Sequence, residues 1–452
     1  MMGTTEKLAR FIAGTCYADI PAPVMHAAKR TIIDTLGVML AGSREPASII
    51  ISSWVRKQGG RARASVAGAG FRTNSPEAAL VNGTTAHVLD YDDVYDPVLG
   101  HPTAALLPAV LAVGEEYQAS GKDILTALVV GFELWAKLSA LGVDPRTIGF
   151  HPTAVLGTMG AAVAAAKILG LNIEPTQMVL GLAASHAGGL SRNRGTMTKP
   201  YHAGNAARNG IISALLVKEG FTAAPDIIEG KFGFCDAFGG TERNEDEVIA
   251  GLGKPYAILS PGVTVKKYPT CYLTHRAIDA TLGLIERYEF SADDVAEVEC
   301  ETGAMARDVL VYNKPVNALQ GKFSLPFCLA VSILERKVGL TEITDVKVKD
   351  PRIEKLMKLV RVKFSDEPEA KQDIVRVKLR NGREYSLGIE KARGSYELPL
   401  TDEEIIAKYR DCAGLVLTRD RAEQALKMVL RLEYLKNINE LMVIIGKRRQ
   451  GK

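Results

Sequence analysis

Hydrophobic residues up to Gly220 recur at intervals of three and four, the spacing that places them along one face of an α-helix. Gly142, Gly170 and Gly220 stand directly after such stretches, where glycine commonly ends a helix. Several stretches are apolar nearly all round, so we expect them at the centre of a helical bundle. The predicted helices are Glu6–Cys16, Pro23–Leu40, Leu106–Tyr117, Lys122–Leu141, Leu156–Leu169, Pro175–His186 and His202–Glu219.

The pattern changes near Lys266, after which short segments alternate apolar and polar residues, as half-buried β-strands do. These segments are Val295–Glu301, Leu359–Phe364 and Ile374–Leu379. Asn381-Gly382 then precedes another such segment, Tyr385–Ile389, and this dipeptide is typical of a tight β-hairpin turn. We therefore expect a sheet in this part of the chain.

Helical spacing also occurs between these strands, at Thr274–Tyr288 and Pro326–Leu334. It returns at Thr401–Leu435, which opens with the helix-capping sequence Thr-Asp-Glu-Glu. The predicted fold class is therefore mainly α: one large all-helical domain with a smaller α+β domain inserted in it. We place the helical domain at residues 1–265 and 401–452 and the inserted domain at residues 266–400.

Composition narrows the choice of partners. The chain of 452 residues is 47% hydrophobic and 24% charged with a net charge of +4, so we expect no nucleic-acid partner. The nearly uncharged stretch Thr147–Ala166 contains a histidine, a proline and glycines, which favours a buried helix over a membrane span. Residues 1–20 carry several charges and no long apolar run, so we expect no secretory signal.

Cysteines and motifs narrow the chemistry. The six cysteines are scattered and form no C-x-x-C pair, which fits a reducing cytoplasm and gives no support for a zinc ribbon or a redox dithiol. The chain also lacks the glycine-rich dinucleotide motif, the Walker loop, the serine-hydrolase elbow and H-E-x-x-H. Nicotinamide, ATP and serine-hydrolase chemistry therefore lack support.

The first group of residues suited to chemistry is Asp90, Asp92 and Asp93, followed by His101 in an H-P-T tripeptide. Carboxylates so closely spaced are costly to bury unless some hold histidines or lysines and another faces a substrate. His101 precedes a predicted helix, whose N-terminus is a suitable place to bind a carboxylate. The alternative is an ordinary acidic turn, or a calcium loop that lacks the required D-x-D-x-D-G spacing.

A second H-P-T tripeptide carries His151, again directly before a predicted helix. A lone histidine usually caps a helix or forms a hydrogen bond in the core. Because the same local setting occurs twice, we favour His101 and His151 as general acid–base groups.

Two further segments carry positive charge. Arg192, Arg194, Lys199 and His202 lie in or beside a polar loop between apolar helices, where they would suit an anionic substrate. Such arginines also commonly pair with surface acids.

Lys266 lies at the domain junction, together with Tyr268 and Cys271. Junctions of this kind often bind ligands, and we expect the lysine to bind carboxylate there. Cys271 is either a reactive thiol or a small buried residue, and we favour the latter because no activating neighbour is evident.

Together these segments resemble the MmgE/PrpD family. The resemblance rests on N-G-T-T-A-H-V-L-D-Y-D-D with H-P-T, on G-F-H-P-T-A-V-L-G-T-M-G, on G-T-M-T-K-P-Y-H-A-G-N and on K-K-Y-P-T-C-Y-L-T-H, and it extends in order over nearly the whole chain. It implies a helical large domain, a smaller lid domain, a cleft between them, a homodimer and no cofactor. It also implies that Asp90, His101, His151, Lys199 and Lys266 line the cleft, with the lysines binding substrate carboxylates.

The resemblance has three departures that bear on the reaction. Members of the family dehydrate 2-methylcitrate, decarboxylate cis-aconitate or epimerise iminodisuccinate. Val94, Cys271 and Phe327 stand where a decarboxylase-type site would have a hydroxyl, an imidazole and a phenol. Our first hypothesis is therefore dehydration of a 2-methylcitrate-like hydroxypolycarboxylate, and our second is epimerisation of a small dicarboxylate. Decarboxylation ranks below both, and a binding protein without catalysis ranks last.

Overall fold

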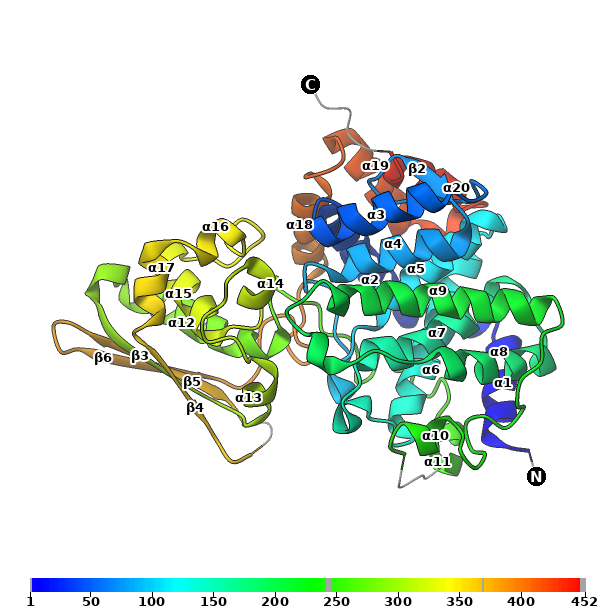
Figure 1. Ribbon diagram of the computed structural model, residues 1–452, viewed down its shortest axis with the longest axis horizontal. Coiled ribbons are helices and arrows are strands. Elements are labelled where there is room, and N and C mark those ends of the chain that lie inside the picture. The colour runs from blue at the N-terminus through cyan, green and yellow to red at the C-terminus, as the bar shows by residue number, and fades with distance from the viewer. Residues whose placement is uncertain (1, 241–244, 368–369, 448–452) are drawn as a thin grey trace.

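The computed structural model describes residues 2–240, 245–367 and 370–447. The chain forms two lobes that lie side by side (Figure 1). The larger lobe, here the helical domain, has its main hydrophobic core built from residues up to Val265 and from Leu400 onward, with a small second cluster around Val38 and Val88. The smaller lobe, here the small domain, has a separate core between Tyr268 and Leu379. The prediction of a mainly α fold is confirmed.

The helical domain contains every helix expected before Gly220, and each begins one to four residues earlier than predicted. The largest differences are at α5, α7 and α9, which begin in polar motifs, two of them at Pro102 and Pro152. Proline is favoured in the first turn, although apolar spacing cannot mark such a start. The helices are α1 Thr4–Gly14, α2 Ala22–Gly42, α3 Pro46–Gln58, α4 Ser75–His87, α5 Pro102–Glu116, α6 Gly121–Ala140, α7 Pro152–Ile168, α8 Ile173–His186, α9 Thr198–Lys218, α10 Phe234–Ala237 and α11 Glu245–Ala250.

Small residues let the central helices approach closely. A Cβ atom added to Gly83 on α4 would lie 2.7 Å from the Cα of Gly204 on α9. A Cβ atom on Gly204 would lie 2.1 Å from the backbone oxygen of Leu80. These two glycines therefore allow α4 and α9 to pack at backbone distance, which brings the C-terminal end of α4 near the start of α9.

The large domain is not all-helical, which corrects the sequence-based prediction. It contains an antiparallel hairpin of β1 Ala64–Val66 and β2 Phe71–Thr73. Three-residue strands are too short for an alternating pattern to show in the sequence. Helices α3 and α4 were not predicted either; α4 buries polar residues such as Asn82 and Thr84 on all sides, so it has no distinct apolar stripe.

The small domain is built on a four-stranded sheet in the order β4-β3-β5-β6. Strand β3 pairs in parallel with β4 and antiparallel with β5, and β5 pairs antiparallel with β6. The predicted strands and the turn at Gly382, which has a φ of 85°, are present. The strands are β3 Val295–Thr302, β4 Val360–Phe364, β5 Asp373–Leu379 and β6 Glu384–Ile389; the helices are α12 His275–Tyr288, α13 Met305–Val309, α14 Ala318–Gly321, α15 Leu325–Glu335, α16 Asp345–Val348 and α17 Pro351–Met357.

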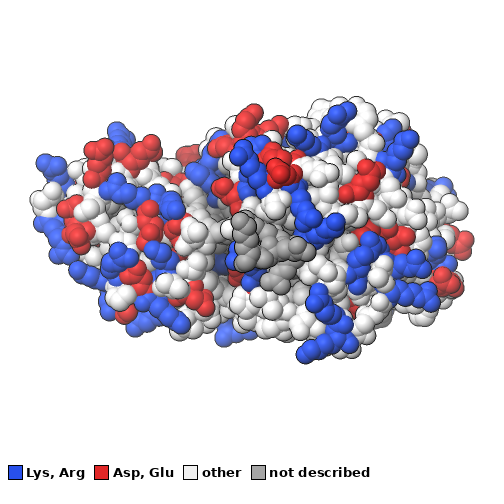
Figure 2. Space-filling model, turned by 90° about the horizontal axis from the view of Figure 1, so that it is seen from above, with Lys and Arg blue, Asp and Glu red and all other residues white. Residues whose placement is uncertain are grey.

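The last helices return to the helical domain, where α18 packs against α2. They are α18 Asp402–Ala413, α19 Arg419–Leu430 and α20 Asn439–Ile445. Among the residues placed by the structure, no helix combines the length and apolar character that crossing a membrane requires. On the face shown in Figure 2, positive and negative side chains are interspersed over both lobes.

Candidate active site

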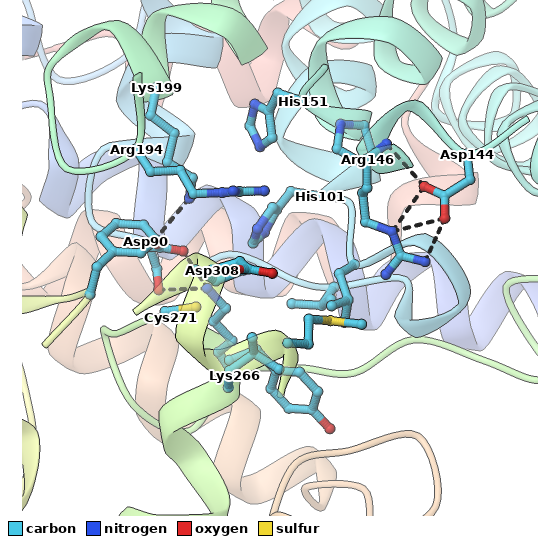
Figure 3. A pocket seen from close by; sticks show the side chains of 18 of the residues that line it. Asp90, His101, Asp144, Arg146, His151, Arg194, Lys199, Lys266, Cys271 and Asp308 are labelled. Carbon is cyan, nitrogen blue, oxygen red and sulfur yellow. Dashed lines mark hydrogen bonds and ion pairs between the residues drawn. The ribbon is translucent and has the colours of Figure 1, made fainter. Parts of the chain in front are cut away.

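A cavity of about 330 Å³ lies between the two domains (Figure 3). The small domain contributes Lys266, Cys271 and Asp308 together with several apolar side chains. The helical domain contributes most of the ionisable groups: Asp90, His101, Arg146, His151, Arg194 and Lys199. The sequence motifs therefore meet in one place, and the domain boundary passes through it.

Asp90 binds two lysines that are distant in sequence. The backbone turns sharply after α4, and Asp90 has a φ of 53°, in the left-handed region. Its carboxylate accepts a hydrogen bond of 2.9 Å from Lys199 Nζ and forms an ion pair with Lys266 Nζ. Burial disfavours the charged carboxylate, but the two ammonium groups outweigh that effect and hold the pKa of Asp90 well below its usual range. Asp90 therefore stays ionised.

His101 is the residue immediately before α5, and its imidazole has a defined tautomer. Its Nδ1 lies 2.8 Å from the backbone oxygen of Asp93 and 3.2 Å from Oδ2 of Asp92. Because a carbonyl oxygen only accepts, Nδ1 carries the proton and Nε2 is left with a lone pair. Burial lowers the pKa of His101, and the attraction of Asp92 does not compensate. The neutral ring is thus arranged as a base.

His151 occupies the corresponding position before α7. Its backbone N–H donates to Gly189, and its Nδ1 lies 3.3 Å from Nδ1 of His202. Burial, reinforced by the nearby Lys199, holds the pKa of His151 well below its usual range and lowers that of His202 to about 4. Both rings are neutral near pH 7, so one of the two facing nitrogens donates a hydrogen bond and the other accepts it.

His87 lies between the two imidazoles, and sequence analysis gave it no role. Its ring centroid is 4.5 Å from that of His101 and 5.6 Å from that of His151. Its Nδ1 lies 2.8 Å from Asp92 Oδ2, so the same carboxylate oxygen is within hydrogen-bonding distance of both His87 and His101. Burial lowers the pKa of His87 to about 3. The motif N-G-T-T-A-H-V-L-D-Y-D-D contains both His87 and Asp92, five positions apart, and this spacing is the feature of the sequence that could have identified His87.

His87, Asp92 and His101 also offer ligand atoms within 4.8 Å of one another, which is a possible metal-binding arrangement. However, the Asp92 oxygen is at hydrogen-bonding distance from both Nδ1 atoms, and the His101 Nδ1 proton also points to a carbonyl. Lys199 and Lys266 lie close enough to disfavour additional positive charge on His101. We therefore interpret this group as a hydrogen-bonded triad.

Asp93 has a structural role. Its carboxyl accepts a hydrogen bond of 3.2 Å from the backbone N–H of Thr103 in the first turn of α5 and also bonds the Thr103 hydroxyl. Burial raises the pKa of Asp93 to about 8, although the Thr103 contacts oppose the rise. The three neighbouring acids thus differ: Asp90 holds lysines, Asp92 holds histidines and Asp93 caps a helix. Asp90 also lines the cavity, where its carboxylate binds the two lysines.

Arg194 differs from the other cations of the cavity. Arg146 is bound by Asp144, with a shortest contact of 2.8 Å, and both lysines are bound by Asp90. Among the described residues, no carboxylate or other acceptor pairs with the Arg194 guanidinium, which points into the cavity (Figure 3). Tyr312 of the small domain donates to its backbone oxygen at 2.9 Å. Arg194 is thus the cation free to take a substrate carboxylate.

Several predicted residues lie elsewhere. Arg192 is exposed and does not line the cavity, because the loop turns its side chain outward. Tyr268 is buried in the small-domain core, where its hydroxyl donates to Asp279 at 2.6 Å. Phe327 is fully buried in that same core, so it does not distinguish one reaction from another. His202 lies behind His151, whereas Cys271, whose pKa burial raises, lines the cavity.

Comparison with known proteins places these features in a family. The MmgE/PrpD N-terminal domain matches residues 6–247 and the MmgE/PrpD C-terminal domain matches residues 268–434. Cis-aconitate decarboxylase of Mus musculus is 28% identical over 98% of this chain and 93% of its own length. That of Aspergillus terreus is also 28% identical, over 98% and 96%. The mitochondrial 2-methylcitrate dehydratase of Yarrowia lipolytica is 25% identical over 81% and 74%.

Proposed function

Because the chain belongs to the MmgE/PrpD family, we propose that it is a lyase that eliminates water from a 2-methylcitrate-like hydroxypolycarboxylate, without a cofactor. The observation that carries this proposal is the pair of neutral imidazoles, His101 and His151, beside the free guanidinium of Arg194. A base next to an anchored carboxylate is what proton abstraction from the neighbouring carbon requires.

The proposed reaction begins with a substrate carboxylate bound by Arg194. Nε2 of His101 takes the proton from the adjacent carbon, and the C–H electrons form the new C=C bond as the C–O bond breaks. Lys199 and Lys266 stabilise the enolate-like charge that develops on the carboxylate. The leaving hydroxyl takes up the proton that His101 has abstracted, while the hydrogen-bonded pair His151 and His202 orients that hydroxyl, so one molecule of water leaves and His101 returns to its neutral form.

The apolar part of the cavity supports a substrate with an alkyl group. Val94 and Leu99 from the helical domain face Leu273, Val309 and Phe323 from the small domain. Such a wall gains free energy from burying a methyl group, at about 0.8 kcal/mol per carbon, and citrate lacks this methyl group. We therefore expect 2-methylcitrate to be preferred over citrate.

Decarboxylation is the second candidate, because the decarboxylases above match 98% of the chain. The same cationic cavity suits a tricarboxylate. Val94 and Cys271 weigh against it, since the family resemblance implies a hydroxyl and an imidazole at these cavity positions.

Epimerisation ranks third in this proposal. An epimerase needs acid and base on opposite faces of the reacting carbon, whereas the His87 ring lies between His101 and His151, 4.5 Å and 5.6 Å from their ring centroids.

Incubation with 2-methylcitrate, citrate, cis-aconitate and tartrate in D₂O, followed by proton NMR and by the absorbance of a new conjugated alkene, separates these candidates. Alkene formation from 2-methylcitrate, lost in His101→Asn and kept in Arg192→Gln, is the expected result. Release of CO₂ from cis-aconitate supports the second candidate. Deuterium incorporation with inversion and no alkene would indicate an epimerase, and binding without turnover would indicate a binding protein.

A further inference from the structure

The turn that carries Asp90, residues 88–91, is held by three buried lysines from different parts of the chain. Its backbone oxygens accept hydrogen bonds from Lys322 (3.0 Å, to Val88), Lys266 (3.0 Å, to Asp90) and Lys408 (2.7 Å, to Tyr91). These oxygens lie at and just beyond the C-terminal end of α4, where the helix dipole favours cations. Lys266 lines the cavity, whereas Lys322 and Lys408 do not.

Asp90 needs such support because it adopts a left-handed conformation. A residue with a Cβ atom loses about 1–2 kcal/mol in this region relative to the right-handed one. A relaxed turn would point the Asp90 carboxylate away from Lys199 and Lys266. The geometry of the whole cationic group therefore depends on what holds this turn.

Lys408 on α18 holds the turn from the helical domain. It is 7% exposed, and its Nζ contacts Asp34 Oδ1 on α2 at 2.6 Å as well as the oxygens of Tyr91 and Lys266, the latter at 2.8 Å. An ammonium group has three protons, so these three acceptors use all of them. One side chain thus fixes the backbone on both sides of the Asp90–Lys266 ion pair.

Lys322 holds the turn from the small domain. It is 3% exposed and precedes Phe323, which lines the cavity. Among the described residues no carboxylate forms an ion pair with Lys322, so the Val88 oxygen is the partner that offsets its burial. This bond exists only while the small domain sits against the helical domain.

We propose that Lys322 and Lys408 are positioning residues that act through the backbone of the 88–91 turn to keep Asp90 between Lys199 and Lys266. Lys322 makes this arrangement depend on the placement of the small domain, so the cationic group is complete only when the two domains are together. The inference rests on the proposed function only in taking this cavity as the active site.

Crystal structures of Lys408→Met and Lys322→Met provide a test that needs no substrate. In both variants we expect Asp90 to leave the left-handed region and its carboxylate to separate from Lys199. Lys137→Met is the matched control, because Lys137 is also partly buried, donates to a backbone oxygen at 2.8 Å and pairs with Glu133, far from the turn. If Asp90 keeps both lysines in the two test variants, the inference is wrong.

Kinetics with the substrate identified by the screen above separate positioning from simple stabilisation. We expect kcat to fall at least tenfold in Lys408→Met and Lys322→Met and to stay within twofold in Lys137→Met. The double variant Asp34→Asn/Lys408→Met leaves no unpaired buried charge, so its Tm should recover while kcat stays low. Recovery of kcat together with Tm would show that Lys408 only stabilises the fold. If the wild-type protein shows no turnover, the proposed function is contradicted. The crystal structures of the two variants then test the positioning role of Lys322 and Lys408 by themselves.

Discussion

His101 shows how one residue is prepared for catalysis by its neighbours. The Asp93 carbonyl and the Asp92 carboxylate both accept from Nδ1, so the reactive nitrogen is Nε2 whenever the ring is neutral. Asp92 also orients His87, which in turn packs against His101 and His151. The imidazole that contacts the substrate is therefore oriented by groups that do not themselves contact the substrate.

Asp92→Asn tests this arrangement. The substitution keeps the shape of the side chain but removes the charge that stabilises a protonated His101, so proton abstraction becomes harder. We expect kcat/KM to fall by about 100-fold, within the range typical of general acid–base groups, with a Tm close to that of the wild type. Steady-state kinetics and thermal unfolding measure the two quantities, and a loss of activity below threefold would contradict the assigned role.

Arg194→Gln tests carboxylate binding, with Arg192→Gln as a control from the same loop. A charge-assisted hydrogen bond contributes about 1.5–3 kcal/mol, so KM should rise about 10- to 150-fold in Arg194→Gln. Arg192 is exposed and outside the cavity, so its variant should keep the wild-type KM. Equal effects of the two substitutions would mean that the loop acts only through its general positive charge.

At the scale of elements, the site is assembled at helix ends. His101 and His151 immediately precede α5 and α7, where the positive end of a helix disfavours a second positive charge and so helps to keep both rings neutral. Asp90 follows the end of α4, and Lys199 lies in the first turn of α9. Packing between these helices sets the distances within the site.

Gly204→Ala tests the contact between α4 and α9. The new methyl group would clash with the Leu80 backbone oxygen, so α9 must shift and carry Lys199 away from Asp90. We expect the free energy of unfolding to fall by about 1–3 kcal/mol, the usual cost of overpacking, and kcat to fall with it. Chemical denaturation measures the former. Gly14→Ala at the end of α1, where an added Cβ atom meets open space, should leave both unchanged.

At the scale of the whole molecule, five buried histidines link stability to pH. Burial lowers the pKa values of these histidines, that of His87 to about 3 and that of His202 to about 4; the other three are His101, His151 and His275. The unfolded chain therefore binds more protons than the native chain below about pH 6.5, and stability falls as the pH decreases. Asp93, whose pKa is raised to about 8, acts in the opposite sense: its contribution is lost as the pH rises toward 8.

Urea unfolding at a series of pH values measures both effects on the free energy of unfolding. Between pH 4 and 6, His87→Asn should reduce the slope of unfolding free energy against pH by one proton, about 1.4 kcal/mol per pH unit. Between pH 5 and 7.5, Asp93→Asn should change that slope by a similar amount in the opposite direction. His26→Asn is the control, because His26 is exposed on α2. If the slope is the same in all three variants and the wild type, the buried groups do not titrate as described.

Taken alone, the amino-acid sequence determined most of the long helices, the strands of the small domain and the Asn-Gly hairpin, because each depends on spacing within a few residues. Its motifs also identified most of the ionisable cavity side chains, including Asp90, His101 and His151. It could not show the β1–β2 hairpin, or that Arg192 and Tyr268 point elsewhere, because short strands and side-chain directions leave no periodic signal.

Only the tertiary structure decided which groups pair and which remain free. Lys199 and Lys266 lie 109 and 176 residues from Asp90, and nothing local in the sequence indicates that both bind it. The same folding leaves Arg194 without a partner among the described residues and places His87 between two other imidazoles. Charge, tautomer and pKa depend on neighbours in space, and the packing of distant helices determines those neighbours.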